Sequence, residues 1–268
     1  MDENGFRKIL NEVSVLNYDN GKKFINTDRL DAISRLLWNS SYRRINAQGL
    51  FHLYAKAPLG DIRGEILLIS SHVDCHKNIT RCFAQEYGSD CLKGTFDNVL
   101  TNAIVLQLML EDSLKANVVV AFTGDEEEDS NGAIKVTRYL KRVGRNFRAV
   151  VLDVTDMGWS EACTFTVEND FCSSFWLERI IRCAMESGQD WKFVPSDPAH
   201  VPMAVPLENI IRQEAEPDES WEYDEQGVEC FSLCIPTAGE MHSDNGILVR
   251  RNALEPYMKM LRKICLVQ

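Results

Sequence analysis

Five consecutive acidic residues follow a short apolar segment near the middle of the chain. The segment NVVVAFT, residues 117–123, is rich in β-branched residues, which predicts a buried strand, and residues 125–129 read DEEED. An acidic run alone is most often a solvated turn. Carboxylates at the end of a buried strand are also the groups that hold cations and move protons, so the run must be judged together with the other strand ends.

Imidazoles and carboxylates also stand at or just beyond the ends of the other predicted strands. These strands are the apolar segments 64–74, 149–154 and 230–236, and one further carboxylate opens a nearly all-apolar helix at residue 97. Because the carboxyl ends of parallel strands meet at one edge of a sheet, we expect these side chains to converge. The set consists of His72, Asp74, Asp97, Glu126, Glu127, Asp153 and His242.

Each member of this set has an ordinary explanation when it is taken alone. A single histidine after a strand is usually a loop residue, and an aspartate at a helix start is usually an N-cap. Together, however, several carboxylates at one place would repel each other and lose solvation unless a cation neutralised them. Mixed imidazole and carboxylate ligands suit Zn²⁺, with Mn²⁺ or Co²⁺ as alternatives.

The elements that must position these residues alternate between strands and helices. Several strands are continuous apolar runs, which is typical of a mostly parallel sheet covered on both faces, and the chain therefore belongs to the α/β class. One domain is predicted over residues 1–268. Besides the strands above, we predict helices at 6–16, from 26, at 97–110, 133–143, 173–187 and from 252, and a hairpin at 44–58.

Two segments are predicted to be loops. The first is 75–96, which contains Cys75, His76, Cys82 and Cys91. Their spacing lacks the paired ligands of structural zinc sites, so buried thiols near the site are the favoured interpretation. The second is 214–225, EAEPDESWEYDE. Its acidity favours a solvated surface loop, and a lid that offers aromatic residues to a ligand is the alternative.

Composition excludes several classes of protein. Lys+Arg 29 against Asp+Glu 40 gives a net charge of −11, which argues against nucleic acid as a partner. No apolar run has the length of a membrane span, and the first residues do not resemble a signal peptide. The nine cysteines, without CxxC pairs, favour reduced thiols and a cytoplasmic location.

The ordered motifs resemble the co-catalytic zinc aminopeptidases of the M28 and M42 types, with the M20 deacylases and carboxypeptidases as relatives. The resemblance spans residues 64–266 and implies the mixed-sheet core of that clan, a phosphorylase/hydrolase-like fold. The matching motifs are HxD at 72–74, GxxDN at 94–98, EE at 126–127 after FT, the Asp of VVLDVT, and HS at 242–243 after IPT.

The resemblance implies a site for two Zn²⁺ ions. Asp97 matches the carboxylate that bridges the two metals. His72 and Asp153 match the ligands of one metal. Glu127 and His242 match the ligands of the other.

Two further residues match catalytic roles. Asp74 matches the acid that orients a metal-bound imidazole, and Glu126 matches the general base that takes a proton from the metal-bridging water. A one-residue shift to Glu127 and Glu128 remains an alternative, since three glutamates are consecutive. The chain departs from the family at Asp129, where a glycine is usual. The interval from His72 to Asp97 leaves no room for the dimerisation domain that M42 and M20 members insert or append.

The predicted function is therefore a di-zinc hydrolase of peptide or amide bonds, an aminopeptidase acting on short peptides. Three alternatives remain. The first is an M20-like deacylase or carboxypeptidase acting on an N-acyl amino acid. The second is a single-zinc enzyme like glutaminyl cyclase. The third is a non-catalytic binding module on the same fold, which predicts lost ligands, whereas all five ligand positions are filled here.

Overall fold

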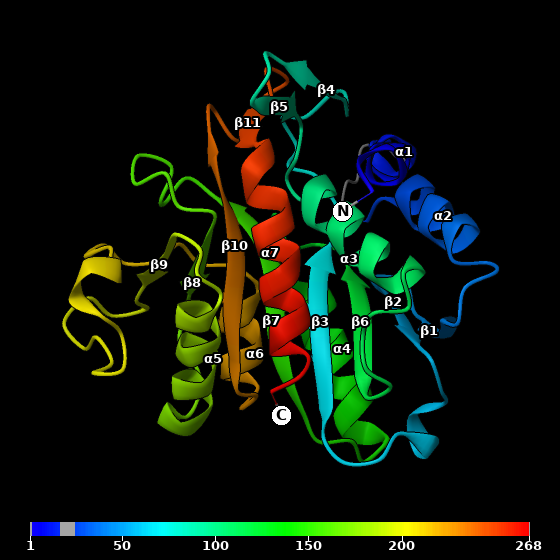
Figure 1. Ribbon diagram of the computed structural model, residues 1–268. Helices are drawn as coiled ribbons and strands as arrows, with labels where there is room; N and C mark the ends of the chain where they lie inside the picture. The colour runs from blue at the N-terminus through cyan, green and yellow to red at the C-terminus, as the bar shows by residue number, and fades with distance from the viewer. Residues whose placement is uncertain (1, 17–24, 268) are drawn as a thin grey trace.

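A central block of four parallel strands organises the chain. The computed structural model describes residues 2–16 and 25–267, and within these ranges eleven strands form one mixed sheet. The central strands β6, β3, β7 and β10 lie side by side in that order and point the same way (Figure 1). Their bounds are Val118–Thr123, Ile66–His72, Phe147–Thr155 and Cys230–Ala238. The predicted α/β class with a mixed central sheet is confirmed, and the parallel strands form the core of that sheet.

Shorter strands extend this block on both sides, mostly in the antiparallel direction. The predicted hairpin forms β1 and β2 and pairs with β6. Beyond β10, β8 and β11 pair with successive parts of that strand, β9 extends β8, and β5 and β4 extend β11. The bounds are β1 Arg43–Ala47, β2 Phe51–Ala55, β4 Ala84–Tyr87, β5 Cys91–Gly94, β8 Phe165–Glu168, β9 Trp191–Val194 and β11 Ile247–Arg250.

Helices cover both faces of the sheet, because alternate residues of each central strand point to opposite sides. Leu67 and Ile69 of β3 face a core built with α1, α2, α3, α5 and α7, whereas Ile66 and Leu68 face a smaller core with α4 and α6. The helices are α1 Glu3–Val13, α2 Thr27–Leu36, α3 Val99–Leu110, α4 Asn131–Arg142, α5 Ser174–Glu186, α6 Glu219–Glu225 and α7 Arg251–Ile264. Short 3₁₀ turns occupy Leu59–Asp61 and Leu207–Asn209.

Helix α3 is buried on nearly all sides, which explains its unusual sequence. Eleven of its residues, Val99 to Met109, are buried between the sheet and the helices α1 and α7. A helix in this position needs no polar face. Its N-terminal end is therefore held in the interior, at the carboxyl ends of β3 and β7, where Asp97 and Asn98 precede it.

The structure corrects the prediction in two segments. Segment 75–96 contains the hairpin β4–β5, so it is not entirely a loop. Segment 214–225 is not a solvated surface loop, because its second half forms α6, with Asp218 accepting a hydrogen bond from the Ser220 N–H. Glu219 and Tyr223, four residues apart, share the helix face that is buried against the sheet. Acidic composition suggested solvation, but this helical spacing directs one face inward.

No helix in the described ranges has the length and apolarity to cross a membrane.

The turn between β6 and α4 is held by backbone contacts at Gly132. The Gly132 N–H donates to the Gly124 carbonyl at 3.0 Å, and the Gly124 N–H donates to the Leu50 carbonyl at 2.9 Å. A Cβ atom at Gly132 would overlap the Gly124 carbonyl oxygen and would lie 2.8 Å from the Gly124 nitrogen. Only glycine lets helix α4 start this close to the end of β6. The short separation holds the turn between them, which carries Glu126 and Glu127, in place.

We therefore predict that Gly132→Ala lowers the free energy of unfolding by about 1–3 kcal/mol, because backbone atoms must move to admit the methyl group. Urea denaturation measures the change. Gly60→Ala is the matched control, since a Cβ there meets nothing within 4 Å, and it should change stability by less than about 0.5 kcal/mol. Equal effects of the two substitutions would contradict the proposed close packing.

Candidate metal centre

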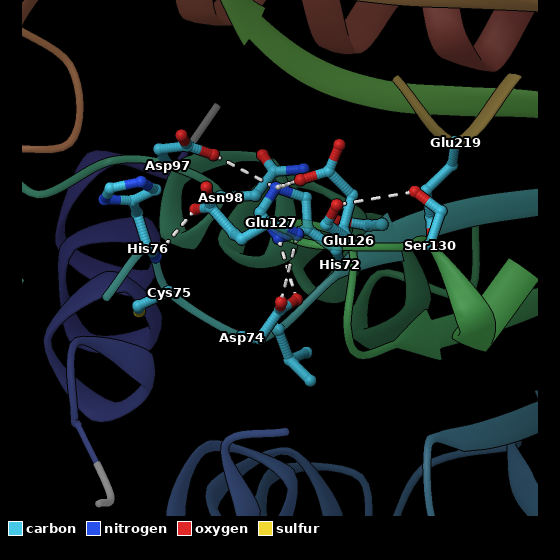
Figure 2. Close-up of polar contacts among 12 residues, drawn as sticks. His72, Asp74, Cys75, His76, Asp97, Asn98, Glu126, Glu127, Ser130 and Glu219 are labelled. Carbon is cyan, nitrogen blue, oxygen red and sulfur yellow. Dashed lines mark hydrogen bonds and ion pairs between the residues drawn. The ribbon is translucent and has the colours of Figure 1, made fainter. Parts of the chain in front are cut away.

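All seven residues selected from the sequence lie together at the carboxyl end of the central sheet. Each comes from a strand end or from the loop or helix start that follows one, as the topology of parallel strands requires. Figure 2 shows His72, Asp74, Asp97, Glu126 and Glu127 gathered at one point. Asp153, near the end of β7, and His242, in the loop after β10, complete the group.

Asp97 lies between the two histidines. Its Oδ1 is 3.0 Å from His72 Nε2, and its Oδ2 is 3.2 Å from His242 Nε2. Two ligand atoms bound about 2.0–2.1 Å from one tetrahedral Zn²⁺ lie about 3.3–3.4 Å apart. The two oxygens of one carboxylate are thus each paired with a different imidazole at the separation of neighbouring ligands. This is the arrangement needed for a carboxylate that bridges two metal ions.

The two remaining ligand candidates each lie near a different histidine. Asp153 Oδ1 is 3.8 Å from His72 Nε2, and Glu127 Oε2 is 3.3 Å from His242 Nε2. His72, Asp97 and Glu127 each offer an atom within 4.8 Å of the others, so these three form a candidate metal-binding group. The donors, imidazole nitrogen and carboxylate oxygen, suit zinc, and the geometry fits the group.

Contacts from neighbouring segments fix the orientation of these side chains. Asp74 Oδ1 is 3.2 Å from His72 Nδ1, which leaves the opposite ring nitrogen, Nε2, facing Asp97. The other oxygen of Asp74 accepts a hydrogen bond from the Glu127 N–H at 3.2 Å. Asn102 of α3 donates to the His72 carbonyl at 2.7 Å, so the strand end and the helix start are tied together. The Asp97–Asn98 peptide bond is cis, and His242 has a positive φ of 58°.

The five acids of the run 125–129 have different surroundings. Glu126 Oε2 lies 3.7 Å from His72 Nε2, and Glu127 accepts a hydrogen bond from the His76 N–H at 2.9 Å. Glu128 is exposed and forms an ion pair with Lys77 at 3.4 Å. Asp125 is buried behind the turn and Asp129 is exposed. This placement favours the pair 126–127 over the pair 127–128.

Burial and mutual repulsion shift the ionisation of these groups. Burial and the nearby Asp97 carboxylate raise the pKa of Glu127 to about 8. Burial likewise raises the pKa of Asp153 to about 6 and that of Glu126 well above its usual range. Burial alone would lower the pKa of His72, but Glu126 and the other carboxylates raise it well above the ordinary value. The metal-free group thus retains protons that a cation would displace.

A cavity of about 580 Å³ opens beside this group. Its wall contains two acids that the sequence analysis missed, Glu168 at the end of β8 and Asp218 just before α6, and also Trp221 of α6. Glu168 is buried, and burial raises its pKa to about 8. Among the described residues that line the cavity there is no lysine or arginine. The cavity is therefore rich in carboxyl groups, some of which burial keeps protonated near neutral pH, and it also contains the Trp221 indole.

A buried polar cluster behind the site also escaped prediction. Ser70 of β3 donates a hydrogen bond to Glu219 at 2.7 Å, and Tyr223 donates to Ser70 at 3.0 Å. Glu219 is only 1% exposed, and burial raises its pKa to about 7. The serines of the otherwise apolar strand β3 give no sign of such a partner. Glu168 stands at a strand end like the predicted ligands, but its strand has only four residues and gave no clear signal in the sequence.

No family model matches the sequence, and no curated protein matches it either. Solved structures do match the fold. A TET aminopeptidase from a marine sediment archaeon, Thaumarchaeota archaeon SCGC AB-539-E09, has a TM-score of 0.71 at 9% identity, over 97% of this chain and 96% of that one. The Pyrococcus horikoshii TET1 peptidase has a TM-score of 0.67 at 10% identity, over 97% and 99% of the two chains.

A zinc aminopeptidase from Bacillus subtilis is a more distant match. Its TM-score is 0.53 at 13% identity, over 80% of this chain and 48% of that one. At these identities the likeness concerns the fold, and the likeness to the TET peptidases extends over nearly the whole chain. The chain has the fold of the zinc aminopeptidases, with a candidate metal site at the edge of its sheet.

Proposed function

We propose that this chain is a single-domain, di-zinc aminopeptidase that acts on short peptides. The observation that carries the proposal is the position of Asp97, which directs one oxygen to His72 and the other to His242. One metal is assigned to His72, Asp97 and Asp153. The other metal is assigned to Asp97, Glu127 and His242.

The residues around the metals have separate tasks in this proposal. Bound zinc ions would acidify a shared water molecule and polarise the scissile carbonyl. Glu126 accepts the proton of the attacking water, and its burial favours this role because a raised pKa brings a carboxylate closer to neutral pH. Asp74 holds His72 in the orientation that presents Nε2.

The acidic cavity supports a substrate with a free amino terminus. Glu168 and Asp218 line the cavity near the assigned ligand Asp153, and the described lining contains no lysine or arginine. A protonated α-amino group can donate hydrogen bonds to these carboxyl groups, and its charge favours their ionised form. An N-acyl amino acid would bring a neutral amide and a carboxylate instead, so the aminopeptidase is preferred over the deacylase.

The first experiment compares aminoacyl-anilides with their N-acetylated forms, in the presence of zinc, manganese or cobalt and after chelation. We expect turnover of the free forms only, its loss on chelation and its return with added metal. Bound metal is measured in parallel by mass spectrometry. Equal cleavage of acetylated substrates would refute the aminopeptidase, one equivalent of metal would favour the cyclase, and full activity without metal would refute the mechanism.

A second prediction separates the adjacent glutamates. Glu126→Gln should keep both metals while the rate falls by about 10² to 10⁴, because the amide cannot accept a proton. Glu127→Ala should lose a metal. Glu128→Gln, the exposed neighbour, is the matched control and should change neither metal content nor rate. Loss of metal in Glu126→Gln with both metals retained in Glu127→Ala would show that the roles are reversed.

A third prediction concerns protons released by metal binding. Glu127, with a pKa of about 8, and Asp153, with a pKa of about 6, must be ionised to act as ligands. We therefore expect zinc to displace protons at pH 7 and its affinity to weaken as the pH falls from about 8 towards 6. Calorimetric titration in two buffers of different ionisation enthalpy measures the release. Identical heats in both buffers would contradict the prediction.

A further inference from the structure

A fully buried arginine lies behind the metal centre, and its charge interacts with the Asp74 side chain and with two cysteines. Arg29, in the first turn of α2, is 0% exposed. Its Nε donates to the Val13 carbonyl at 3.1 Å, and its Nη1 donates to the Val73 carbonyl at 2.9 Å and reaches the Asp74 carbonyl at 3.4 Å. None of its hydrogen bonds in the described part of the chain is with a carboxylate. A buried cation of this kind needs a counter-charge.

Two cysteines occupy the remaining side of this guanidinium. Arg29 Nη2 is 3.2 Å from the sulfur of Cys75 and 3.6 Å from the sulfur of Cys82, and the two sulfurs are 3.9 Å apart. Cys75 is buried, whereas Cys82 is half-buried and within reach of a small solute. Cys91, which the sequence placed with them, is not part of the contact. A thiolate on one cysteine would place a negative charge in direct contact with the guanidinium, in addition to the nearby Asp74 carboxylate.

The environment makes the two thiols unequal. A hydrogen bond from the Cys75 thiol and the positive charge of Arg29 lower the pKa of Cys82 to about 6. These two effects are larger than that of burial, which raises the pKa. The same contact and burial raise the pKa of Cys75 well above its usual range. Cys82 is therefore the nucleophile, and Cys75 is a protonated thiol next to it. This pairing of an attacking and a resolving cysteine is the arrangement of redox-active thiols.

We propose that Cys82 and Cys75 form a peroxide-reactive dithiol that closes reversibly to a disulfide beside the metal centre. The Cys82 thiolate attacks one oxygen of a hydroperoxide, the O–O bond breaks, and the products are a sulfenic acid and hydroxide, or alkoxide from an organic peroxide. Cys75 sulfur then attacks the Cys82 sulfur. The S–O bond breaks and the hydroxyl leaves as water with the Cys75 proton. The peroxide gains the two electrons that the two sulfurs lose. A thiol reductant later gives two electrons back to the disulfide and restores both thiols.

The position of the dithiol connects it to the metal ligands. Cys75 lies on the loop that leaves β3, between Asp74 and His76 (Figure 2). The His76 N–H holds Glu127, and its ring stacks on His242 with centroids 4.3 Å apart. Closing the disulfide must shorten the sulfur–sulfur distance to about 2.05 Å and removes the thiolate that balances Arg29. We therefore expect the oxidised protein to hold metal more weakly.

Peptide mapping of the full chain after treatment with hydrogen peroxide and alkylation of the remaining thiols tests the disulfide. Trypsin cleaves at Lys77 and Arg81, so Cys75 and Cys82 fall on different peptides and a bridge appears as a cross-linked pair. The expected pair is 75–82, and dithiothreitol should remove it. The Cys91→Ser control should still form it, whereas Cys75→Ser should stop at a sulfenic acid on Cys82 that dimedone traps. A bridge between other cysteines, or no bridge, would overturn the proposal.

The rate of alkylation tests the role of Arg29. At pH 7 iodoacetamide should modify Cys82 at least about tenfold faster than Cys91, which is also half-buried, because the thiolate is the reactive form. Arg29→Gln should remove this advantage. Where that substitution prevents folding, the ratio in the unmodified chain decides, and a ratio near one would overturn the assignment of Cys82 as the thiolate.

The link to the metals rests on the proposed function and has its own readout. Zinc retained after dialysis should fall on oxidation of the natural chain and recover after reduction and addition of zinc, whereas Cys75→Ser treated in the same way should retain it. Unchanged zinc in a protein shown to carry the 75–82 bridge would disprove the link. Failure of zinc to bind the reduced chain would instead count against the proposed function, because the mapping and alkylation experiments require no metal.

Discussion

The concentration of negative charge at one edge of the sheet is the constraint around which this structure is organised. Five carboxylates, from Asp74 to Asp153, meet there with only two imidazoles to offset them. Burial, and after it the repulsion between neighbouring carboxylates, raise the pKa values of Glu126 and Glu127. Most of the surrounding architecture, from the buried helix α3 to the close approach at Gly132, holds these groups together against it.

The Asp74 carboxylate helps to hold the metal-ligand candidates in place, although it is not assigned as a ligand itself. One of its oxygens faces His72 and the other accepts the backbone N–H of Glu127, so a single carboxylate orients the groups assigned to both metals. On the other side of the same strand end, Arg29 binds the carbonyls of Val73 and Asp74. The segment after β3 is thus held by the Asp74 carboxylate on the side of the metal site and by the Arg29 guanidinium on the side of the core. The proposed dithiol lies at the junction of these two interactions.

The sequence was sufficient to predict the parts of the site that obey a local rule. The seven selected residues lie at or just beyond strand ends or at a helix start, and an apolar run followed by a polar residue is visible without any knowledge of tertiary contacts. Glu168 obeys the same rule, but its four-residue strand is too short to be recognised. The contact of Arg29 with Cys82 joins residues 53 positions apart, and no local pattern reports it. Likewise, the acidic segment 214–225 concealed a helix, because the depth at which α6 packs depends on the sheet beneath it.

The order in which the strands assemble has a consequence for how this protein acquires its metals. Asp97 and His242 are separated by 145 residues, and β10, which leads to His242, pairs with β7. Loop-closure entropy makes such distant contacts late events in folding. Until β10 docks, the carboxylates of the first half can offer only part of a ligand set. A metal ion that binds only the completed site would then stabilise the folded chain by mass action. It would bind after most of the chain has folded and would not direct the earlier steps.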